Sequence, residues 1–463
     1  MNYLWAEHRV FPAGDGAILF GVDHASLFFI DAQTREVLQR LGSRPSLNLS
    51  ETAPQDREIL SGLREARFLR PEITMERPAP VLPDPQGIPL ATMVLEVAQD
   101  CNLRCTYCYA EGGGYGGERR LLTPQTARKA VRLLLREAAD REVVTLVLFG
   151  GEPLLNMPAV KAAIEEAVLK GGEAGKKVQI SLTTNGTLLS PEIIAFLHHH
   201  RVGVSISLDG PPDLHDANRP DISGRGSYTR ILPKLLQLLH NTPAPVGARV
   251  TLIPNQWSRI EEVYDHLISL GFHEVGIAPA SPITNELLPD SDQEEILLQG
   301  FATMARRFKE EAEKGRILPF SNILDLLGRL HLGQTKSIAC GAGFGYLAVD
   351  AAGDFFPCHR LAGEEIFRVG DLDSGIDMHK ISASLATLTE GKAQMCSDCW
   401  ARTLCAGGCH YENHLRETKL GMPPGGSCHF IRSWLQLGIE LYAELRRTGA
   451  EALLERLEKR IAG

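Results

Sequence analysis

A short run with three cysteines constrains this chain more than any other feature of its sequence. Cys101, Cys105 and Cys108 lie in the run Cys-Asn-Leu-Arg-Cys-Thr-Tyr-Cys, spaced Cys-x3-Cys-x2-Cys. Three thiolates on one loop can bind three irons of a 4Fe–4S cluster, whereas an ordinary cluster takes four cysteines. The spacing therefore leaves one iron free for another ligand. The alternative, a zinc loop, requires pairs of ligands spaced for a tetrahedral site and a fourth ligand nearby.

With the aromatic Tyr107 before its last cysteine, this loop resembles the cluster motif of the radical S-adenosylmethionine (SAM) superfamily. The resemblance implies that the open iron binds SAM and that Tyr107 belongs to the cofactor site. It also implies that one electron cleaves SAM to methionine and a 5′-deoxyadenosyl radical, which abstracts hydrogen from an unactivated C–H bond. In such enzymes the cofactor supplies the reactive chemistry, and the protein supplies binding, orientation and a dry cavity.

Length, charge and cysteine usage narrow the class further. The chain has 463 residues, 44% of them hydrophobic, which is enough for two or three domains. Its net charge of −9 gives no general attraction for nucleic acid or an anionic membrane. No run of about 18 apolar residues predicts a membrane span, and the N-terminus lacks the pattern of a secretory signal. Ten cysteines, many of them closely spaced, indicate metal ligation and a cytoplasmic location rather than disulfides.

Residues 1–75 are predicted to form a small α+β unit. Two apolar runs, Ala17–Val22 and Ser26–Ile30, predict a hairpin. Asp31 is placed to cap a following helix, and a second helix is expected around Pro54–Ala66. The arrangement resembles the winged-helix peptide-recognition domain of peptide-modifying radical SAM enzymes, which would bind a leader peptide by strand addition along the hairpin edge. A plain structural cap on the next domain is the alternative.

Residues 76–90 contain five prolines and predict a linker. Beyond it, strand-like runs alternate with helical patterns up to residue 320. The expected strands are Thr92–Val97, Val143–Leu148, Val178–Thr183, Val202–Leu208, Val246–Leu252 and Glu274–Ile277. The expected helices are Pro124–Ala139, Pro158–Lys170, Pro191–His200, Tyr228–Leu239 and Ile260–Leu270. The alternation predicts an α/β fold, a partial (β/α)6 barrel over residues 91–320 with ligands at the carboxyl ends of its strands.

Small and polar residues follow three of these strands. Gly150-Gly151-Glu152-Pro153 follows the second, and its glycines allow the backbone to approach a ligand closely. The matching family motif recognises the amino group of SAM. Thr183-Thr184-Asn185-Gly186 ends the third strand, and Ser207-Leu208-Asp209-Gly210 ends the fourth. The resemblance assigns the ribose and carboxylate of SAM to side chains at these positions, which are Thr184, Asn185, Ser207 and Asp209.

Two arginines are further candidates. Arg249 lies within the fifth strand, and a guanidinium buried there needs an anionic partner, either the SAM carboxylate or a neighbouring carboxylate. The segment 215–228 resembles the loop after the fourth strand in peptide-modifying members, in which Arg219 is a substrate contact or a turn anchor. The run His198–His200 is not expected to bind metal, because consecutive residues do not share a helix face. No residue is assigned as a catalytic acid or base.

The remaining seven cysteines all lie in the C-terminal third, which indicates a second metal-binding region. They are Cys340, Cys358, Cys396, Cys399, Cys405, Cys409 and Cys428. Twelve residues separate Cys340 from Gly353, and a run spaced Cys-x2-Cys-x5-Cys-x3-Cys follows. This pattern resembles the SPASM domain, expected over residues 321–430, which holds two auxiliary 4Fe–4S clusters in enzymes that modify peptides or proteins. A zinc ribbon is the alternative for Cys396–Cys409 taken alone.

The resemblance implies a division of these ligands. One auxiliary cluster would take four cysteines, Cys396, Cys399, Cys405 and Cys428. Cys340, Cys358 and Cys409 remain for the other, and the chain has no spare cysteine for its fourth iron. A substrate thiolate bound there would lie near the carbon radical and lead to a thioether. Water, or a side chain such as His359 or Gln334, is the alternative ligand.

The residue after the second of these cysteines separates two branches of the family. Sulfatase-maturating enzymes have an aspartate there, which serves as a base, whereas this chain has His359. The chain instead resembles thioether-forming maturases of ranthipeptides and of the small subunit of quinohemoprotein amine dehydrogenase. In the latter group, Cys sulfur is joined to side-chain carbons of Asp or Glu, and residues 26–38 also resemble that group. Residues 431–463 are expected to form a terminal helix packed across the barrel.

These observations predict a radical SAM/SPASM peptide maturase with SAM and three 4Fe–4S clusters, forming thioether cross-links. Its substrate would be a Cys-containing precursor peptide or small protein subunit with a leader, and its electron donor a flavodoxin or ferredoxin. Neither nucleic acid nor a membrane is an expected partner. The alternatives within enzymes are formylglycine formation, carbon–carbon cross-linking and epimerisation. A non-catalytic iron–sulfur electron carrier is the alternative outside enzymes, and cleavage of SAM to 5′-deoxyadenosine would exclude it.

Overall fold

The computed structural model describes most of the chain. The described residues are 2–13, 16–72, 84–85, 87–241, 244–421, 426–449, 453, 455–457 and 460. Most of the linker predicted at residues 76–90 lies outside this set, as does much of the end of the helix predicted at 431–463. Within the described part of the chain, no helix is long and apolar enough to cross a membrane.

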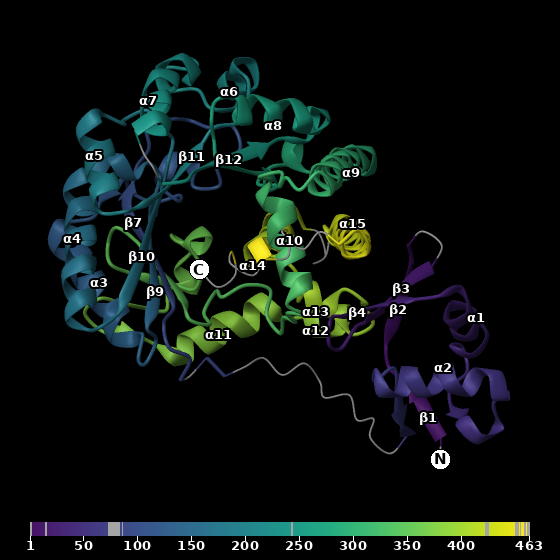
Figure 1. The fold of residues 1–463 in the computed structure, drawn as a ribbon. Coiled ribbons are helices and arrows are strands. Elements are labelled where there is room, and N and C mark those ends of the chain that lie inside the picture. The colour runs from purple at the N-terminus through teal and green to yellow at the C-terminus, as the bar shows by residue number, and fades with distance from the viewer. Residues whose placement is uncertain are drawn as a thin grey trace.

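Six parallel strands form the centre of the molecule (Figure 1), in the hydrogen-bonded order β7-β9-β10-β11-β12-β13. Their bounds are β7 Thr92–Gln99, β9 Val143–Gly150, β10 Lys177–Thr184, β11 Gly203–Ser207, β12 Val246–Leu252 and β13 Glu274–Pro279. Each coincides, to within two residues at either end, with a strand expected from the sequence, so the α/β fold and its strand succession are confirmed. Because all six are parallel, their carboxyl ends meet at one edge of the sheet.

Helices cover the outer face of this curved sheet (Figure 1). They are α3 Pro124–Glu137, α4 Met157–Glu173, α5 Pro191–His199, α6 Pro212–Asn218, α7 Tyr228–Asn241 and α8 Ile260–Ser269. Alternate residues of β7, Met93, Leu95 and Val97, belong to the core shared with Val131 and Leu134 of α3. The other face of each strand is left for the barrel interior. The short helix α6 was not expected from the sequence.

The sheet extends beyond the six strands. Strand β14 (Tyr346–Val349) lies parallel to β7 on its free side, and β15 (Phe355–Phe356) pairs antiparallel with β14. The short β8 (Arg120–Leu121) pairs antiparallel with the end of β7. The barrel sheet therefore includes strands from beyond residue 320, where the sequence pattern placed the end of the barrel.

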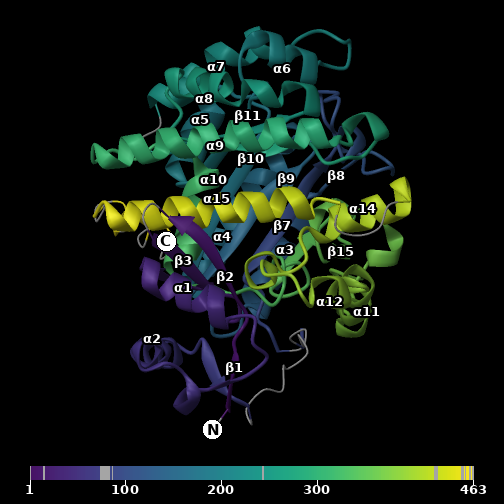
Figure 2. The ribbon, with the colours of Figure 1, turned by 90° about the vertical axis from the view of Figure 1, so that its right-hand side faces the viewer.

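The C-terminal third contributes long helices and a series of short elements. The remaining elements up to the C-terminal helix are α9 Ser291–Glu313, α10 Ser321–His331, β16 Gly370–Asp371, β17 Gly375–Ile376, α11 Met378–Thr389, α12 Lys392–Cys396, α13 Arg402–Cys405, α14 His410–Leu420 and α15 Cys428–Arg447. Short 3-10 turns are η1 Leu49–Glu51, η3 Glu111–Gly113, η4 Pro153–Asn156, η5 Pro254–Arg259, η6 Asn285–Leu287, η7 His359–Leu361 and η8 Glu365–Phe367. Helix α15 runs alongside α9 (Figure 2) and also packs against α10.

The N-terminal region contains two small sheets and two helices. Strands β2 (His8–Ala13), β3 (Gly16–Gly21) and β4 (Ser26–Ile30) form an antiparallel meander, which confirms the predicted hairpin and adds β2 to it. The second sheet pairs β1 with two short strands, and its elements are β1 Asn2–Trp5, β5 Leu47–Asn48 and β6 Leu69–Pro71. Helix α1 (Ala32–Leu41) begins as predicted at Asp31, whose Oδ1 accepts a hydrogen bond from Thr34 N at 2.7 Å, and α2 spans Pro54–Glu65.

The β2–β3–β4 sheet is covered on both faces. Its Phe11, Ile18 and Phe20 pack with Trp400 and with Ile439 of α15, while Leu19 and Ile30 face α1 and α2. Figure 2 shows β2 and β3 lying directly against α15. The N-terminal region is therefore joined to the cysteine-rich part by an apolar contact, and its two outer strands, β2 and β4, are the edges of the meander.

Candidate functional site

The three-cysteine loop lies between β7 and η3, above the carboxyl ends of the barrel strands. A bridge pairs Leu103 with Asp221, and the amides of Arg104 and Thr106 donate to Pro220 O at 2.7 Å and Asn218 O at 2.9 Å. The segment after α6 therefore fixes the backbone of the loop.

Backbone amides also approach the sulfurs of the loop. Leu103 N lies 3.4 Å from Cys101 Sγ, and Gly112 N lies 3.4 Å from Cys108 Sγ. Burial raises the pKa of the Cys101 thiol to about 12, and Glu152, Cys105 and Cys108 add to this. Amide donors and a bound cation both favour the thiolate form that a metal requires. The donor set fits an iron–sulfur cluster held by Cys101, Cys105 and Cys108.

The Gly150–Glu152 turn packs directly onto this loop. Gly151 N donates to Ala98 O at 2.7 Å, and Glu152 N donates to Asp100 O at 2.9 Å. A Cβ at Gly151 would lie 2.3 Å from Asp100 O, and Gly150 has a φ of +129° that favours glycine. Both glycines are therefore required for the backbone of β9 to reach the cysteine loop.

The Glu152 carboxylate is fully buried and joins β9 to β10. Its Oε1 accepts from Thr184 Oγ1 at 2.6 Å and Leu154 N at 3.0 Å, and its Oε2 accepts from Asn185 N at 2.8 Å. Burial raises the pKa of Glu152, while these three hydrogen bonds lower it. Since its oxygens already accept hydrogen bonds from the protein, Glu152 orients the end of β10.

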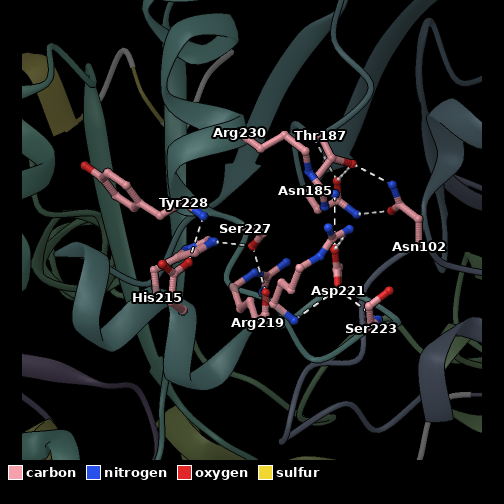
Figure 3. Close-up of polar contacts among 12 residues, drawn as sticks. Asn102, Asn185, Thr187, His215, Arg219, Asp221, Ser223, Ser227, Tyr228 and Arg230 are labelled. Carbon is pink, nitrogen blue, oxygen red and sulfur yellow. Dashed lines mark hydrogen bonds and ion pairs between the residues drawn. The ribbon is translucent and has the colours of Figure 1, made fainter.

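Asn185 links that strand end to the cysteine loop (Figure 3). Its Nδ2 donates to Asn102 Oδ1 at 2.9 Å and lies 3.8 Å from Cys101 Sγ. Asn102 Nδ2 in turn donates to Thr187 Oγ1 at 2.8 Å, and Thr187 Oγ1 donates to Asn185 Oδ1 at 2.6 Å. Asn185 is therefore already positioned beside the thiols by a closed set of hydrogen bonds.

A buried group connects Tyr107 with the end of β11. Tyr107 OH donates to Asp209 Oδ2 at 2.6 Å and accepts from Arg219 Nη1 at 2.6 Å, while Arg219 Nη1 lies 4.0 Å from Asp209 Oδ1. Asp209 also accepts from Thr251 N at 3.2 Å and Asn218 Nδ2 at 3.4 Å. Arg219 is 8% exposed and lies behind the loop. Its partners in the structure are Tyr107 and Asp209, and the substrate contact remains a prediction.

His215 was not assigned a role from the sequence, yet it supports this group (Figure 3). Asp209 N donates to His215 Nδ1 at 3.3 Å, so Nε2 carries the proton and donates to Ser227 Oγ at 2.9 Å. Ser227 Oγ donates to Arg219 O at 2.7 Å. Burial, assisted by the charge of Arg219, lowers the pKa of His215 to about 3. The imidazole is therefore neutral and fixes the backbone on both sides of α6.

Ser207 and Arg249 are neighbours in register on β11 and β12. The expectation that the Arg249 guanidinium is buried is wrong, because its side chain is exposed within the open barrel interior. Arg249 Nη1 lies 3.5 Å from Ser321 Oγ, and a Cβ at the neighbouring Gly276 would lie 2.6 Å from that nitrogen. The absence of a side chain at Gly276 leaves room for the guanidinium across β13.

The other seven cysteines form two groups in space. Cys358 lies near Cys340 and Cys409, and burial followed by these neighbouring thiols raises the pKa of Cys358 to about 12. The second group contains Cys396, Cys399, Cys405 and Cys428. Burial and then the three other thiols raise the pKa of Cys396, and burial and then Cys428 and Cys399 raise that of Cys405. The structure therefore brings together the same sets that the SPASM resemblance implies, and their ligation of clusters remains a prediction.

Charged and aromatic side chains surround these thiols. The buried Lys392 lies near thiols of both groups, and its Nζ lies 3.0 Å from His410 Nδ1. His359 Nδ1 lies 2.6 Å from Tyr346 OH and 4.0 Å from Cys358 Sγ, so that nitrogen already has Tyr346 as its hydrogen-bond partner. Gln334 is exposed at the end of α10. Of these two alternative ligands, His359 is the one beside the thiols.

Among the described residues, no three His, Cys, Asp or Glu side chains converge to hold a single metal ion. Cysteines around a 4Fe–4S cluster each bind a different iron, so they need not meet at one point. The three consecutive histidines predicted not to bind metal lie at the end of α5, where the rings of His199 and His200 meet edge to face.

Comparison with known proteins defines the class of this site. Residues 95–267 match the family model of the radical SAM superfamily. The chain is 23% identical to a serine-type anaerobic sulfatase-maturating enzyme of Klebsiella aerogenes, over 71% of this chain and 82% of that enzyme. It is 22% identical to a cysteine-type anaerobic sulfatase-maturating enzyme of Clostridium novyi, over 78% of this chain and 98% of that enzyme.

Solved structures show the same fold. The structure of native anSMEcpe with bound AdoMet has a TM-score of 0.65 at 18% identity and covers 77% of this chain and 98% of its own. Streptococcus suis SuiB bound to precursor peptide SuiA has a TM-score of 0.50 at 14% identity and covers 90% of this chain and 97% of its own. At these identities the likeness is one of fold.

Proposed function

We propose that this chain is a radical SAM/SPASM peptide maturase that forms a thioether between a substrate cysteine and a carbon of another residue. The observation that carries the proposal is the auxiliary group of three thiols, Cys340, Cys358 and Cys409. Three cysteines for the SAM cluster and four for the second auxiliary group account for the rest of the ten. One ligand position beside the barrel is thus left for a substrate thiol.

The SAM site in this proposal uses the network above the barrel strands. Cys101, Cys105 and Cys108 would hold a 4Fe–4S cluster, which when bound with SAM supplies a 5′-deoxyadenosyl radical. Gly150 and Gly151 present backbone carbonyls to the amino group of SAM. The ribose and carboxylate would meet polar side chains at three strand ends, contributed by Thr184, Asn185, Ser207, Asp209 and Arg249. Glu152, Tyr107 and Arg219 hold these groups in position.

Formation of one thioether removes two hydrogens from the substrate. With SAM and the clusters bound, the cofactor would take a hydrogen atom from the C–H carbon, and a metal beside Cys340, Cys358 and Cys409 would favour loss of the proton from the substrate thiol. One further electron must leave the substrate as the C–S bond forms, and an iron–sulfur cluster held by the auxiliary cysteines would be able to accept it. A thiol fixed beside the barrel is held close to the carbon that reacts, which favours this bond over competing reactions.

The N-terminal region is proposed to bind the leader of the substrate by strand addition. A groove of about 240 Å³ lies between edge strand β2 and α1, lined by His8, Val10, Arg35 and Leu38 among others. Edge strands present unpaired backbone groups that an extended peptide can pair with. The fold likeness to SuiB, a structure bound to its precursor peptide, supports this assignment. Arg35→Glu is expected to weaken leader binding by fluorescence anisotropy, whereas Arg44→Glu, in the loop after α1, is not.

Formylglycine formation is the second candidate, because the sulfatase-maturating enzymes are the relatives with long matches. This chain has His359 where the resemblance to that branch implies an aspartate base. His359 Nδ1 shares a hydrogen bond with Tyr346 OH at 2.6 Å. Oxidation of a serine or cysteine side chain would leave no cross-link, so the two candidates differ in product.

The test is anaerobic reconstitution with SAM, dithionite and a Cys-containing peptide encoded beside this chain's gene, followed by high-resolution mass spectrometry. Loss of two hydrogens per bridge, with the cysteine no longer alkylatable under reducing conditions, is the expected result. Cys340→Ala is the matched variant, expected to cleave SAM without forming the cross-link. If the native enzyme cleaves SAM but leaves the cysteine alkylatable, thioether formation is wrong.

A further inference from the structure

A second pocket lies outside the barrel, where the N-terminal sheet, the cysteine-rich region and α15 meet. It has a volume of about 360 Å³. Its walls include Arg9 of β2, Cys399 and Trp400 from the loop before α13, and Arg432 of α15. Figure 2 shows α15 crossing the front of the molecule with β2 against it, so these elements form part of one outer face.

Two arginines and one carboxylate lie on the rim of this pocket, which are Arg9, Arg432 and Asp398. Both arginines are exposed and supply its positive charge. The side chain of His429 is 65% exposed, and its Nδ1 lies 3.7 Å from Glu294 Oε2. The guanidinium of Arg9 lies over the Trp400 ring at 5.2 Å, and such stacking fixes the direction of an arginine without neutralising its charge.

The inner wall of the pocket reaches the group of four thiols. Cys399 lines the pocket directly, and Cys428 lies one helical turn before Arg432 on α15. Burial raises the pKa of the Cys428 thiol and the charge of Arg432 lowers it, so the two side chains are close. The pocket therefore connects the outer surface with the thiols assigned to the second auxiliary cluster.

We propose that this pocket is the docking surface for an acidic one-electron carrier of the flavodoxin or ferredoxin class. The inference rests on the proposed function, which requires an electron for each SAM cleaved. In the transfer the reduced carrier loses one electron and the iron–sulfur group held by Cys396, Cys399, Cys405 and Cys428 gains it. No bond is made or broken in this step.

Charge complementarity favours this occupant. The whole chain has a net charge of −9, so it repels an acidic protein in general. A local cluster of cations then determines where such a protein can approach, and surface charges of this kind act mainly on association rate and salt dependence. Encounters between electron carriers and their partners bury small, polar interfaces, which suits a pocket rimmed by Arg9 and Arg432.

The experiment measures binding of a purified flavodoxin to the reconstituted full-length enzyme by anaerobic surface plasmon resonance. The double variant Arg9→Gln/Arg432→Gln is compared with Arg446→Gln/Arg447→Gln, which removes two exposed arginines from the far end of the same helix. At low ionic strength the first variant is expected to bind about tenfold more weakly and with a flatter salt dependence. The control variant is expected to bind like the native enzyme.

Two further measurements distinguish loss of docking from loss of activity or of folding. SAM cleavage driven by dithionite reports on the proposed function without any carrier, and thermal unfolding reports on the fold. Slower cleavage with reduced flavodoxin, at an unchanged dithionite rate, supports the docking surface. Equal flavodoxin affinity in all three proteins overturns it, and so does a loss of affinity for the precursor peptide instead of the flavodoxin. Failure of dithionite-driven cleavage in the native enzyme would instead contradict the proposed function.

Discussion

The SAM site and the auxiliary region are built in different ways. Around the three-cysteine loop, buried side chains from successive strand ends satisfy one another, as Glu152 does with Thr184 and Tyr107 does with Asp209. Around the auxiliary thiols the elements are short, and Cys340 and Cys409 are exposed. The barrel part of the site is therefore preorganised by the protein alone, whereas the auxiliary part depends more on what its thiols bind.

This difference follows from local structure. A parallel strand end brings backbone amides and side chains to one edge in fixed positions, so a polar network there needs only the barrel core to support it. Short helices of four or five residues, such as α12 and α13, cannot hold a conformation without external contacts. Metal binding supplies such contacts in small cysteine-rich folds.

Removing a cysteine of the SAM loop is expected to have the largest effect on activity and little effect on the barrel. Cys105→Ala takes away one of three ligands, so cleavage of SAM to 5′-deoxyadenosine should fall below detection and iron content should drop by about four per chain. Because the network of Glu152 and Asn185 is independent of that thiol, the barrel should keep its hydrogen-exchange protection. Loss of protection in β9 and β10 would contradict the preorganised site.

Chelation of iron is expected to change hydrogen exchange differently in the two regions of the same protein. Anaerobic treatment with a chelator should increase hydrogen exchange over residues 392–409, where helices are shortest, by more than over β9–β11. The barrel strands are covered by the large core of the molecule and serve as the internal control. Equal increases in both regions would show that the auxiliary part is as self-supporting as the barrel.

The six barrel strands could be predicted from the sequence, whereas the additional strands β14 and β2 could not. Six strands and five helices follow from apolar periodicity, which records burial directly. Strand β14 was missed because it has four residues and pairs with β7, some 250 positions earlier, and no local pattern encodes that pairing. Strand β2 was missed for a different reason: it pairs with the adjacent β3, but it contains Pro12 and exposed residues and so has no apolar run.

Within the site, the SPASM resemblance implied which thiols lie together, but the sequence did not predict how the polar residues pair. His215 and Ser227 carry no motif of their own, and only the fold brings them to Asp209 and Arg219. Arg249 was expected to be buried because strands of a barrel are, yet its side chain is exposed. The alternation of side chains along a strand predicts which face of the sheet a residue lies on. Whether other residues pack against that face depends on the whole fold.

Removing one hydroxyl tests the buried network behind the SAM loop. Tyr107→Phe deletes the group that donates to Asp209 and accepts from Arg219, each at 2.6 Å, and leaves both charges buried without it. We expect a loss of about 2–3 kcal/mol in the free energy of unfolding, measured with denaturant on the apo protein. Tyr264→Phe is the matched control, since its buried hydroxyl has no hydrogen-bond partner among the described residues. Similar losses in both variants would assign the effect to the ring environment rather than the network.

The neutral His215 should make the preorganised site sensitive to acid, with the smallest of these effects. The native state keeps its imidazole neutral down to about pH 3, whereas the unfolded chain takes up this proton near 6.5. Between these values the unfolded state binds more protons, so this contribution is complete above the unfolded pKa and is lost as pH falls. From about pH 6 to about pH 5, native stability should drop by about 1 kcal/mol more than that of His215→Gln. Glutamine can accept from Asp209 N and donate to Ser227 without titrating, so parallel pH profiles would show that His215 is charged in the native state.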